Sequence, residues 1–179
     1  MKKFRSTKII NMFGGPGSGK STTASGLFSL MKCIGMSTEI VHEYAKDLTW
    51  HGDDFSLSAQ DHVFSTQHMR IRRLVGKVDY VITDSPLLLS AVYAKPDDFQ
   101  KSLKAVISET FNHYDNINFF IARVKPYVKE GRSQDERQAA VKDNEISALI
   151  NAEQIDYTIV NGDDNAAQTI FDTITKKVF

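Results

Sequence analysis

The sequence predicts an α/β fold in which a five-stranded parallel sheet carries helices on both faces. Short apolar runs alternate with longer segments in which apolar residues recur every three or four positions. The apolar runs are continuous, which is typical of parallel strands because such strands are covered on both faces. We expect strands at Lys8 to Phe13, Thr38 to His42, Tyr80 to Thr83, Ile117 to Ile121 and Tyr157 to Val160.

Segments with helical spacing lie between and after these runs. The stretch from Tyr44 to Val78 contains a helix, with Ser56 or Ser58 as its cap. Further helices are expected at Asp97 to His113, Asp135 to Glu153 and Ala166 to Lys177. Strand, helix and strand in this order imply right-handed crossovers.

Length and composition limit the classes of protein. A chain of 179 residues fits one domain, residues 1–179. Basic and acidic residues number 22 each, so the chain has no overall positive field to attract nucleic acid or an anionic membrane. No stretch approaches the roughly 20 apolar residues that cross a bilayer, and we expect a cytoplasmic protein. The single cysteine, Cys33, lies on an apolar helix stripe and is expected to be a buried thiol.

The segment Gly14 to Thr22 reads GGPGSGKST and follows the first strand. It matches the phosphate-binding pattern GxxxxGK[ST] in full. Its glycines permit positive φ, so that successive N–H groups turn toward the β- and γ-phosphates of ATP or GTP. Lys20 adds a positive charge, and the Ser21 hydroxyl can reach a bridging Mg²⁺. The nucleotide contacts are expected at Gly15, Gly17, Ser18, Gly19, Lys20, Ser21, Thr22 and Arg123.

This loop, after a strand and before a helix, predicts the three-layer P-loop NTPase fold of nucleotide kinases. No NKxD-type guanine signature follows the fourth strand, which favours ATP over GTP. The short polar loop around Gly162, after the fifth strand, is where such folds often meet the adenine. ATP and Mg²⁺ are therefore the expected cofactors.

Two carboxylates follow neighbouring strands. Asp84 ends the run YVITDSP, where a second Mg²⁺-directed carboxylate is expected, although it could instead cap a helix. Glu43 ends the run IVHEY on the acceptor side of the same edge. It can take a proton from an acceptor hydroxyl, or it could be a solvated residue at a helix start. An acceptor that is already a phosphate would need arginines instead.

The segment from about 44 to 78 is the candidate acceptor region. Tyr44 and Trp50 could stack on a nucleobase, although a lone Trp is more often part of a satellite core. Gln67 could pair with a base edge, or lie on a solvated face. Arg70 and Arg73 could hold an acceptor phosphate, or form a surface stripe that pairs with carboxylates.

The segment from about 123 to 137 is a candidate lid that is rich in basic residues. Mobile arginines there can neutralise charge on the transferred phosphoryl group and help to exclude water. Arg132, which follows Gly131, is the first candidate, ahead of Arg123 and Arg137. The alternative is a solvated helix start of mixed charge.

The loop, HEYA after the second strand, DSP after the third and the YVKEGR segment together resemble a small P-loop kinase. The chain is similar to the nicotinamide riboside kinase-like group, which includes bacteriophage nucleoside, nucleotide and DNA-base kinases. The resemblance implies acceptor and metal roles for Glu43 and Asp84, and a lid role for Arg132. The segment Trp50 to Arg73 matches no substrate signature that we can name, so the resemblance does not identify the acceptor.

Four functions are consistent with these residues. The first is transfer of phosphoryl from ATP and Mg²⁺ to a hydroxyl of a nucleoside, nucleotide or related base-bearing acceptor. The second, which the resemblance implies, is a kinase acting on 5-hydroxymethyluracil in DNA, with Arg70 to Arg73 following the strand. The third is a nucleotide monophosphate kinase. The fourth is an ATPase or nucleotide-gated switch with a protein partner, but Ser85 and Pro86 follow Asp84 where a catalytic Glu would be expected. A homo-oligomer is compatible with all four.

Overall fold

The computed structural model describes residues 6–94, 99–128 and 135–176. Within these ranges one sheet has five parallel strands in the order β2-β3-β1-β4-β5. Their bounds are β1 Lys8–Phe13, β2 Thr38–Val41, β3 Tyr80–Thr83, β4 Asp115–Ala122 and β5 Thr158–Asn161. The central strand pairs on both sides, with Ile10 opposite Ile82 of β3 and Ile117 of β4. The predicted five-stranded parallel sheet is confirmed.

Helices lie between the strands and after the last strand. Their bounds are α1 Lys20–Cys33, α2 Tyr44–His51, α3 Asp54–Ser58, α4 Gln60–Arg72, α5 Leu89–Tyr93, α6 Gln100–Asn112, α7 Glu136–Ala152 and α8 Ala166–Thr175. The expected helices that begin near Asp97 and Asp135 correspond to α6 and α7, and Asp97 itself lies outside the described residues.

The segment predicted as one helical region between β2 and β3 is three helices. Gly52 takes a left-handed conformation, φ 68°, and ends α2. Asp53 then caps α3 by accepting a hydrogen bond from the Ser56 backbone N–H at 3.0 Å. The prediction that Ser56 or Ser58 caps the following helix was wrong, because both serines lie within α3, and α4 begins after Ala59 without a side-chain cap among the described residues.

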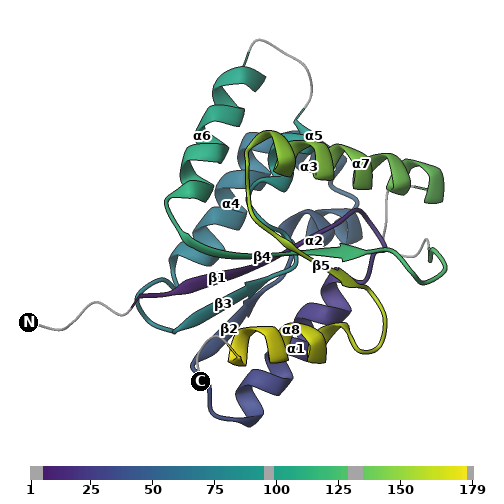
Figure 1. Cartoon of the computed structure of the whole chain (residues 1–179). Coiled ribbons are helices and arrows are strands. Elements are labelled where there is room, and N and C mark those ends of the chain that lie inside the picture. The colour runs from purple at the N-terminus through teal and green to yellow at the C-terminus, as the bar shows by residue number, and fades with distance from the viewer. Residues whose placement is uncertain (1–5, 95–98, 129–134, 177–179) are drawn as a thin grey trace, which may run out of the picture.

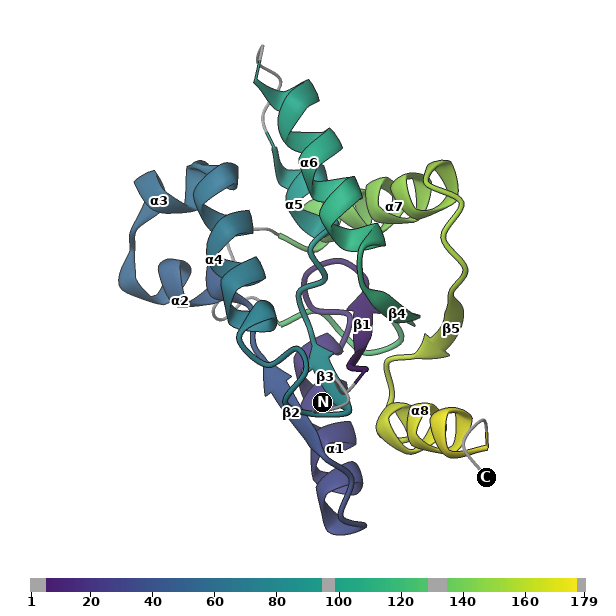
Figure 2. The same ribbon diagram turned by 90° about the vertical axis from the view of Figure 1, so that its left-hand side faces the viewer.

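The sheet is the middle of three layers. One face packs on α1 and α8 through Ile10, Met12 and Phe119, whereas the other face packs on α4 to α7 through Ile9 and Phe13. Figure 1 shows α1 and α8 below the sheet and α6 and α7 above it, and Figure 2 shows the same separation from the side. Successive residues of β1 therefore bury their side chains on opposite faces, as a continuous apolar strand requires.

Cys33 differs from expectation, because its side chain is exposed. The buried positions of α1 are Thr23, Ala24, Leu27 and Met31. Cys33 follows Met31 by two residues and so lies on another face of the helix. Among the described residues no helix combines the length and apolar character that crossing a bilayer requires.

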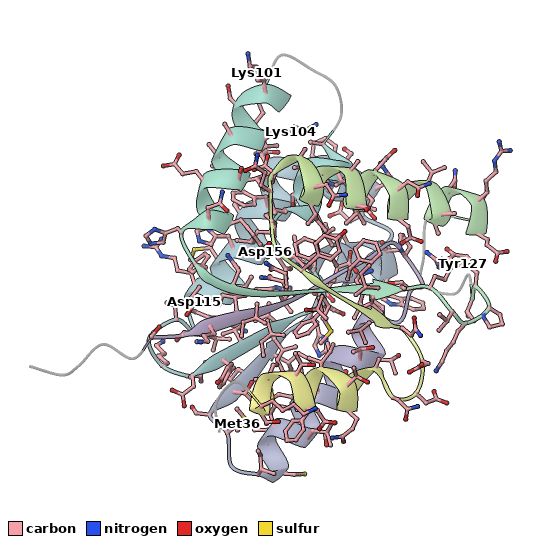
Figure 3. All side chains as sticks on the ribbon, in the orientation of Figure 1. Met36, Lys101, Lys104, Asp115, Tyr127 and Asp156 are labelled. Carbon is pink, nitrogen blue, oxygen red and sulfur yellow. The ribbon has the colours of Figure 1, made fainter. Side chains whose placement is uncertain are left out.

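All five strands run in one direction, so their carboxyl ends share one edge of the sheet. Figure 3 shows Asp115, at the start of β4, and Tyr127, beyond the end of that strand, on opposite sides of the molecule. The segments that follow the strands near Tyr127 are where a parallel sheet collects ligands.

Candidate active site

Each strand end contributes a residue or loop to the carboxyl edge of the sheet. Glu43 follows β2, Asp84 follows β3 and the phosphate loop follows β1. Arg123 directly follows β4, and Gly162 directly follows β5. The strand order therefore sets these groups side by side, with the loop in the middle, the carboxylates on one flank and Arg123 on the other.

The phosphate loop has the conformation that its glycines permit. Gly17 and Gly19 have φ of 77° and 104°, values that other residues rarely adopt. Gly19 is the N-cap of α1, and no side chain of the described residues caps this helix end. The N–H groups of the first turn, which includes Lys20, Ser21 and Thr22, have no intrahelical partners, and the helix dipole favours an anion there.

Gly15 is glycine for a different reason from the one we expected. It does not have a positive φ, so the predicted conformation is wrong at this position. A Cβ on Gly15 would lie 2.5 Å from Asp143 Oδ1 and 2.8 Å from the Ala139 carbonyl oxygen. The glycine is therefore required because α7 packs directly on the loop.

Asp143 of α7 joins the loop to Arg123. Its Oδ1 accepts a hydrogen bond from the Gly15 backbone N–H at 2.5 Å, and its Oδ2 accepts from Arg123 Nη2 at 2.8 Å. The other terminal nitrogen, Arg123 Nη1, is buried and has no hydrogen-bond partner among the described residues. This nitrogen would lie 3.0 Å from a Cβ on Gly17, so it faces the glycines of the loop. A phosphate oxygen could complete the hydrogen bonding of this guanidinium.

Lys20 and Glu43 are electrostatically coupled. Burial lowers the pKa of Lys20, whereas the carboxylates of Glu43 and Asp84 raise it. Burial also raises the pKa of Glu43, against the attraction of Lys20. Lys20 Nζ donates a hydrogen bond to the Gly15 carbonyl at 2.9 Å, which holds the ammonium group over the loop.

Asp84 and Ser21 fit a magnesium ion bound through phosphate. Asp84 is 2% exposed, and its Oδ1 is buried with no hydrogen-bond partner among the described residues. An unpaired buried carboxylate oxygen is costly, and a bound cation is one group that would satisfy it. Mg²⁺ binds oxygen, usually through one or two protein ligands together with substrate phosphates and water. The oxygens of Asp84 and Ser21 would supply such a set.

Three of the residues predicted to bind the acceptor form a connected group on α2 and α4. Arg70 pairs with Asp47 at 2.8 Å and lies over the Tyr44 ring at 4.8 Å. The Tyr44 hydroxyl is 2.9 Å from His62 Nε2. Gln67 is buried and hydrogen bonded to both the start of α2 and the end of β3. Tyr44, Gln67 and Arg70 therefore lie together.

Trp50 and Arg73 lie outside this group. Trp50 is 66% exposed near the end of α2, so it is not part of a satellite core. Arg73 is exposed at the C-terminal end of α4. Three residues later, Gly76 hydrogen bonds to Thr7, just before β1, so Arg73 lies toward the amino edge of the sheet. Arg132 and its neighbours at 129–134 lie outside the described residues, and Arg137 is exposed in the first turn of α7.

Sequence reasoning missed Tyr93 and treated Asp143 only as a surface partner for the basic residues before α7, so it missed the contact of Asp143 with the phosphate loop. Ala139, Ile146 and Ile150 are the buried residues of α7, and Asp143 follows Ala139 by four positions on the same face. A lone carboxylate on a buried helix stripe was the signal available for Asp143. Tyr93 ends α5, a short helix that the sequence pattern did not predict. The pKa of the Tyr93 hydroxyl is raised, mainly by burial and next by the negative charge of Glu43.

The fold and the loop together define a P-loop protein with a carboxylate pair beside the phosphate site. The sequence pattern of a family described as an AAA domain matches residues 9–167, and the chain belongs to that family. No curated protein sequence matches the chain. Among solved structures, the chain is similar to a deoxyadenosine kinase from M. mycoides with bound dATP, with 18% identity and a TM-score of 0.58. The likeness covers 95% of this chain and 98% of that chain, and it supports the predicted small P-loop kinase fold.

Proposed function

We propose that this protein is a kinase that transfers the γ-phosphoryl group of ATP to a hydroxyl of a nucleoside or a related base-bearing acceptor. The observation that carries the proposal is the position of Glu43, which follows β2 on the acceptor flank and is coupled to Lys20 and Asp84. The structural neighbour acts on a nucleoside according to its name, and this agrees with the proposal.

The donor side is assigned to the loop and α1. The N–H groups of residues 17–22 and the ammonium group of Lys20 would bind the β- and γ-phosphates. Arg123, held by Asp143, would contribute to a phosphate oxygen its Nη1, which has no hydrogen-bond partner within the described part of the chain. Ser21 and Asp84 would hold Mg²⁺, which supplies charge neutralisation on the phosphates.

Glu43 is the proposed general base. Its carboxylate takes the proton from the acceptor hydroxyl as the hydroxyl oxygen forms a bond to the γ-phosphorus. The bond from that phosphorus to the bridging oxygen breaks, and ADP leaves with the electron pair. The raised pKa of Glu43 suits this role, because a base is most effective when its pKa lies nearer to the working pH.

The charges on the acceptor flank favour a hydroxyl over a phosphate acceptor. Arg70 is already paired with Asp47 and stacked on Tyr44, and Arg73 lies toward the other edge of the sheet. Carboxylates of Asp84 and Asp47 also act on Glu43. A phosphate bound there would meet like charges, whereas a neutral hydroxyl would not.

The test is incubation with γ-labelled ATP and a panel of acceptors. The panel contains nucleosides, nucleoside monophosphates, nicotinamide riboside and DNA with hydroxymethylated bases. We expect label on a nucleoside or nicotinamide riboside. Label only on monophosphates would favour the monophosphate kinase, and label only on DNA would favour the DNA-base kinase. Steady phosphate release with no labelled acceptor would favour the ATPase.

A further inference from the structure

Gln67 is a polar side chain in an unusual place. It lies in the middle of α4, is 3% exposed, and is surrounded by the buried residues of that helix, among them Val63, Phe64 and Ile71. Burying a primary amide is costly unless both its oxygen and its nitrogen are hydrogen bonded. The Gln67 amide meets this requirement through two segments that are far apart in the sequence.

The amide oxygen is bound to the start of α2. Gln67 Oε1 accepts a hydrogen bond from the Tyr44 backbone N–H at 3.0 Å. Tyr44 is the first residue of α2 and Glu43 is its N-cap, so this N–H has no intrahelical partner. Gln67 thus satisfies an otherwise unpaired donor and fixes the backbone directly after Glu43.

The amide nitrogen is bound to the end of β3. Gln67 Nε2 donates to Thr83 Oγ1 at 3.4 Å, and the same Oγ1 accepts from the Ser85 backbone N–H at 3.1 Å. Thr83 and Ser85 flank Asp84 on both sides. The hydroxyl of Thr83 therefore folds the turn that carries Asp84, and Gln67 holds that hydroxyl.

We infer that Gln67 is a positioning residue that sets the spacing between Glu43 and Asp84, and so between the acceptor base and the magnesium carboxylate. This inference rests on the proposed function. It replaces the expected contact between Gln67 and a base edge, because both ends of the amide are engaged within the protein and the side chain is buried.

An amide is suited to this role because one side chain must accept from an N–H and donate to a hydroxyl oxygen at once. Gln67→Met keeps the length and removes both hydrogen bonds. Gln67→Glu keeps the acceptor for Tyr44 but adds a negative charge between Glu43 and Asp84, and that charge would raise the pKa of Glu43 further.

The experiment combines kinetics with amide hydrogen exchange, after transfer by the wild-type protein has been measured on the acceptor panel. For Gln67→Met we expect kcat to fall about 10- to 100-fold, in line with misplacement of a reacting group by about 1 Å. The KM for ATP should stay within about twofold of wild type, since the loop is untouched. Exchange at the Tyr44 and Ser85 amides should accelerate. In Gln67→Glu the acidic limb of the pH profile of kcat should move to higher pH, because the added charge raises the pKa of Glu43.

Gln168→Met is the matched control, because that glutamine forms an exposed contact with Asp172 on α8. Gln168→Met should leave kcat and the exchange rates of the Tyr44 and Ser85 amides unchanged. The inference is overturned if Gln67→Met raises the KM for the acceptor at unchanged kcat, which would indicate a substrate contact. It is also overturned if the Tyr44 and Ser85 amides stay as protected as in wild type. A wild-type protein that labels no acceptor would instead refute the proposed function, and the exchange data would still decide whether Gln67 bridges the two turns.

Discussion

The carboxylate of Asp143 accepts a hydrogen bond from the backbone N–H of Gly15 at 2.5 Å, across 128 residues of sequence. The same carboxylate pairs with Arg123 through Nε at 3.2 Å and Nη2 at 2.8 Å. One side chain of α7 therefore holds both the phosphate loop and the guanidinium beside it.

Asp143→Ala should destabilise the folded protein. The substitution leaves the Gly15 N–H and a partly buried guanidinium without their acceptor, which typically costs about 1–3 kcal/mol. For a domain of this size, each kcal/mol lowers the melting temperature by about 2–4 °C. Thermal unfolding followed by circular dichroism measures the shift. Asp164→Asn is the control, since Asp164 also pairs with a cation, Lys125, but at the exposed surface. Equal melting temperatures for Asp143→Ala and wild type would show that this link is not structural.

Lys20→Met should weaken ATP binding by at least about tenfold, which corresponds to about 1.4 kcal/mol. The reason is the loss of a charge-assisted hydrogen bond to phosphate from an ammonium group held over the loop. Titration calorimetry with ATP measures the change. Lys32→Met, which removes an exposed lysine near the far end of α1, should bind ATP as wild type does. Unchanged affinity in Lys20→Met would refute the assignment of the donor site.

Asp84→Asn should raise the Mg²⁺ concentration for half-maximal activity by at least about tenfold. The buried Asp84 Oδ1, which has no hydrogen-bond partner among the described residues, is the oxygen expected to contact the Mg²⁺ ion or its bound water. Activity titrated with Mg²⁺ at saturating ATP provides the measurement. Asp115→Asn, at the opposite edge of the sheet, serves as the matched variant. An Mg²⁺ dependence identical to wild type would mean that Asp84 caps a turn instead.

Glu43→Gln should make the protein more stable at neutral pH. Burial raises the pKa of Glu43 even against the attraction of Lys20. A carboxyl with a raised folded-state pKa contributes stability that is complete below the unfolded pKa and lost as the pH rises through the folded pKa. Glutamine mimics the protonated form, so the advantage should be present at about pH 7 and vanish near pH 3.

Urea unfolding at both pH values measures this difference, with Glu109→Gln on the exposed face of α6 as the control for the substitution itself. A Glu43→Gln protein that is less stable than wild type at neutral pH would contradict a raised pKa of Glu43 in the folded protein.

The fold was predictable because its signals are local. The bounds of β1 and β3 agree with their apolar runs, since central strands are apolar on both faces. The phosphate loop was recognisable because its residue types are fixed by backbone geometry and charge. The division of α2 from α3 was less visible, although Gly52 marks it.

The interactions that hold the site residues in place were not predictable from local sequence patterns. Asp143 and Gln67 act through partners that are 128 and 23 positions away, and only the packing of α7 and α4 on the sheet brings them there. Gly15 illustrates the same limit, because the motif explains a glycine by its φ whereas the fold requires one through its contact with α7. Arg73 shares a helical stripe with Arg70 but lies one turn nearer the amino edge of the sheet.

The most direct test of the central claim is the turnover of Glu43→Gln on the acceptor that wild type phosphorylates. We predict a loss of at least about 100-fold in kcat with little change in the KM for ATP, as expected when a general base is removed. Near-normal turnover of a folded Glu43→Gln protein would contradict transfer to a hydroxyl activated by Glu43.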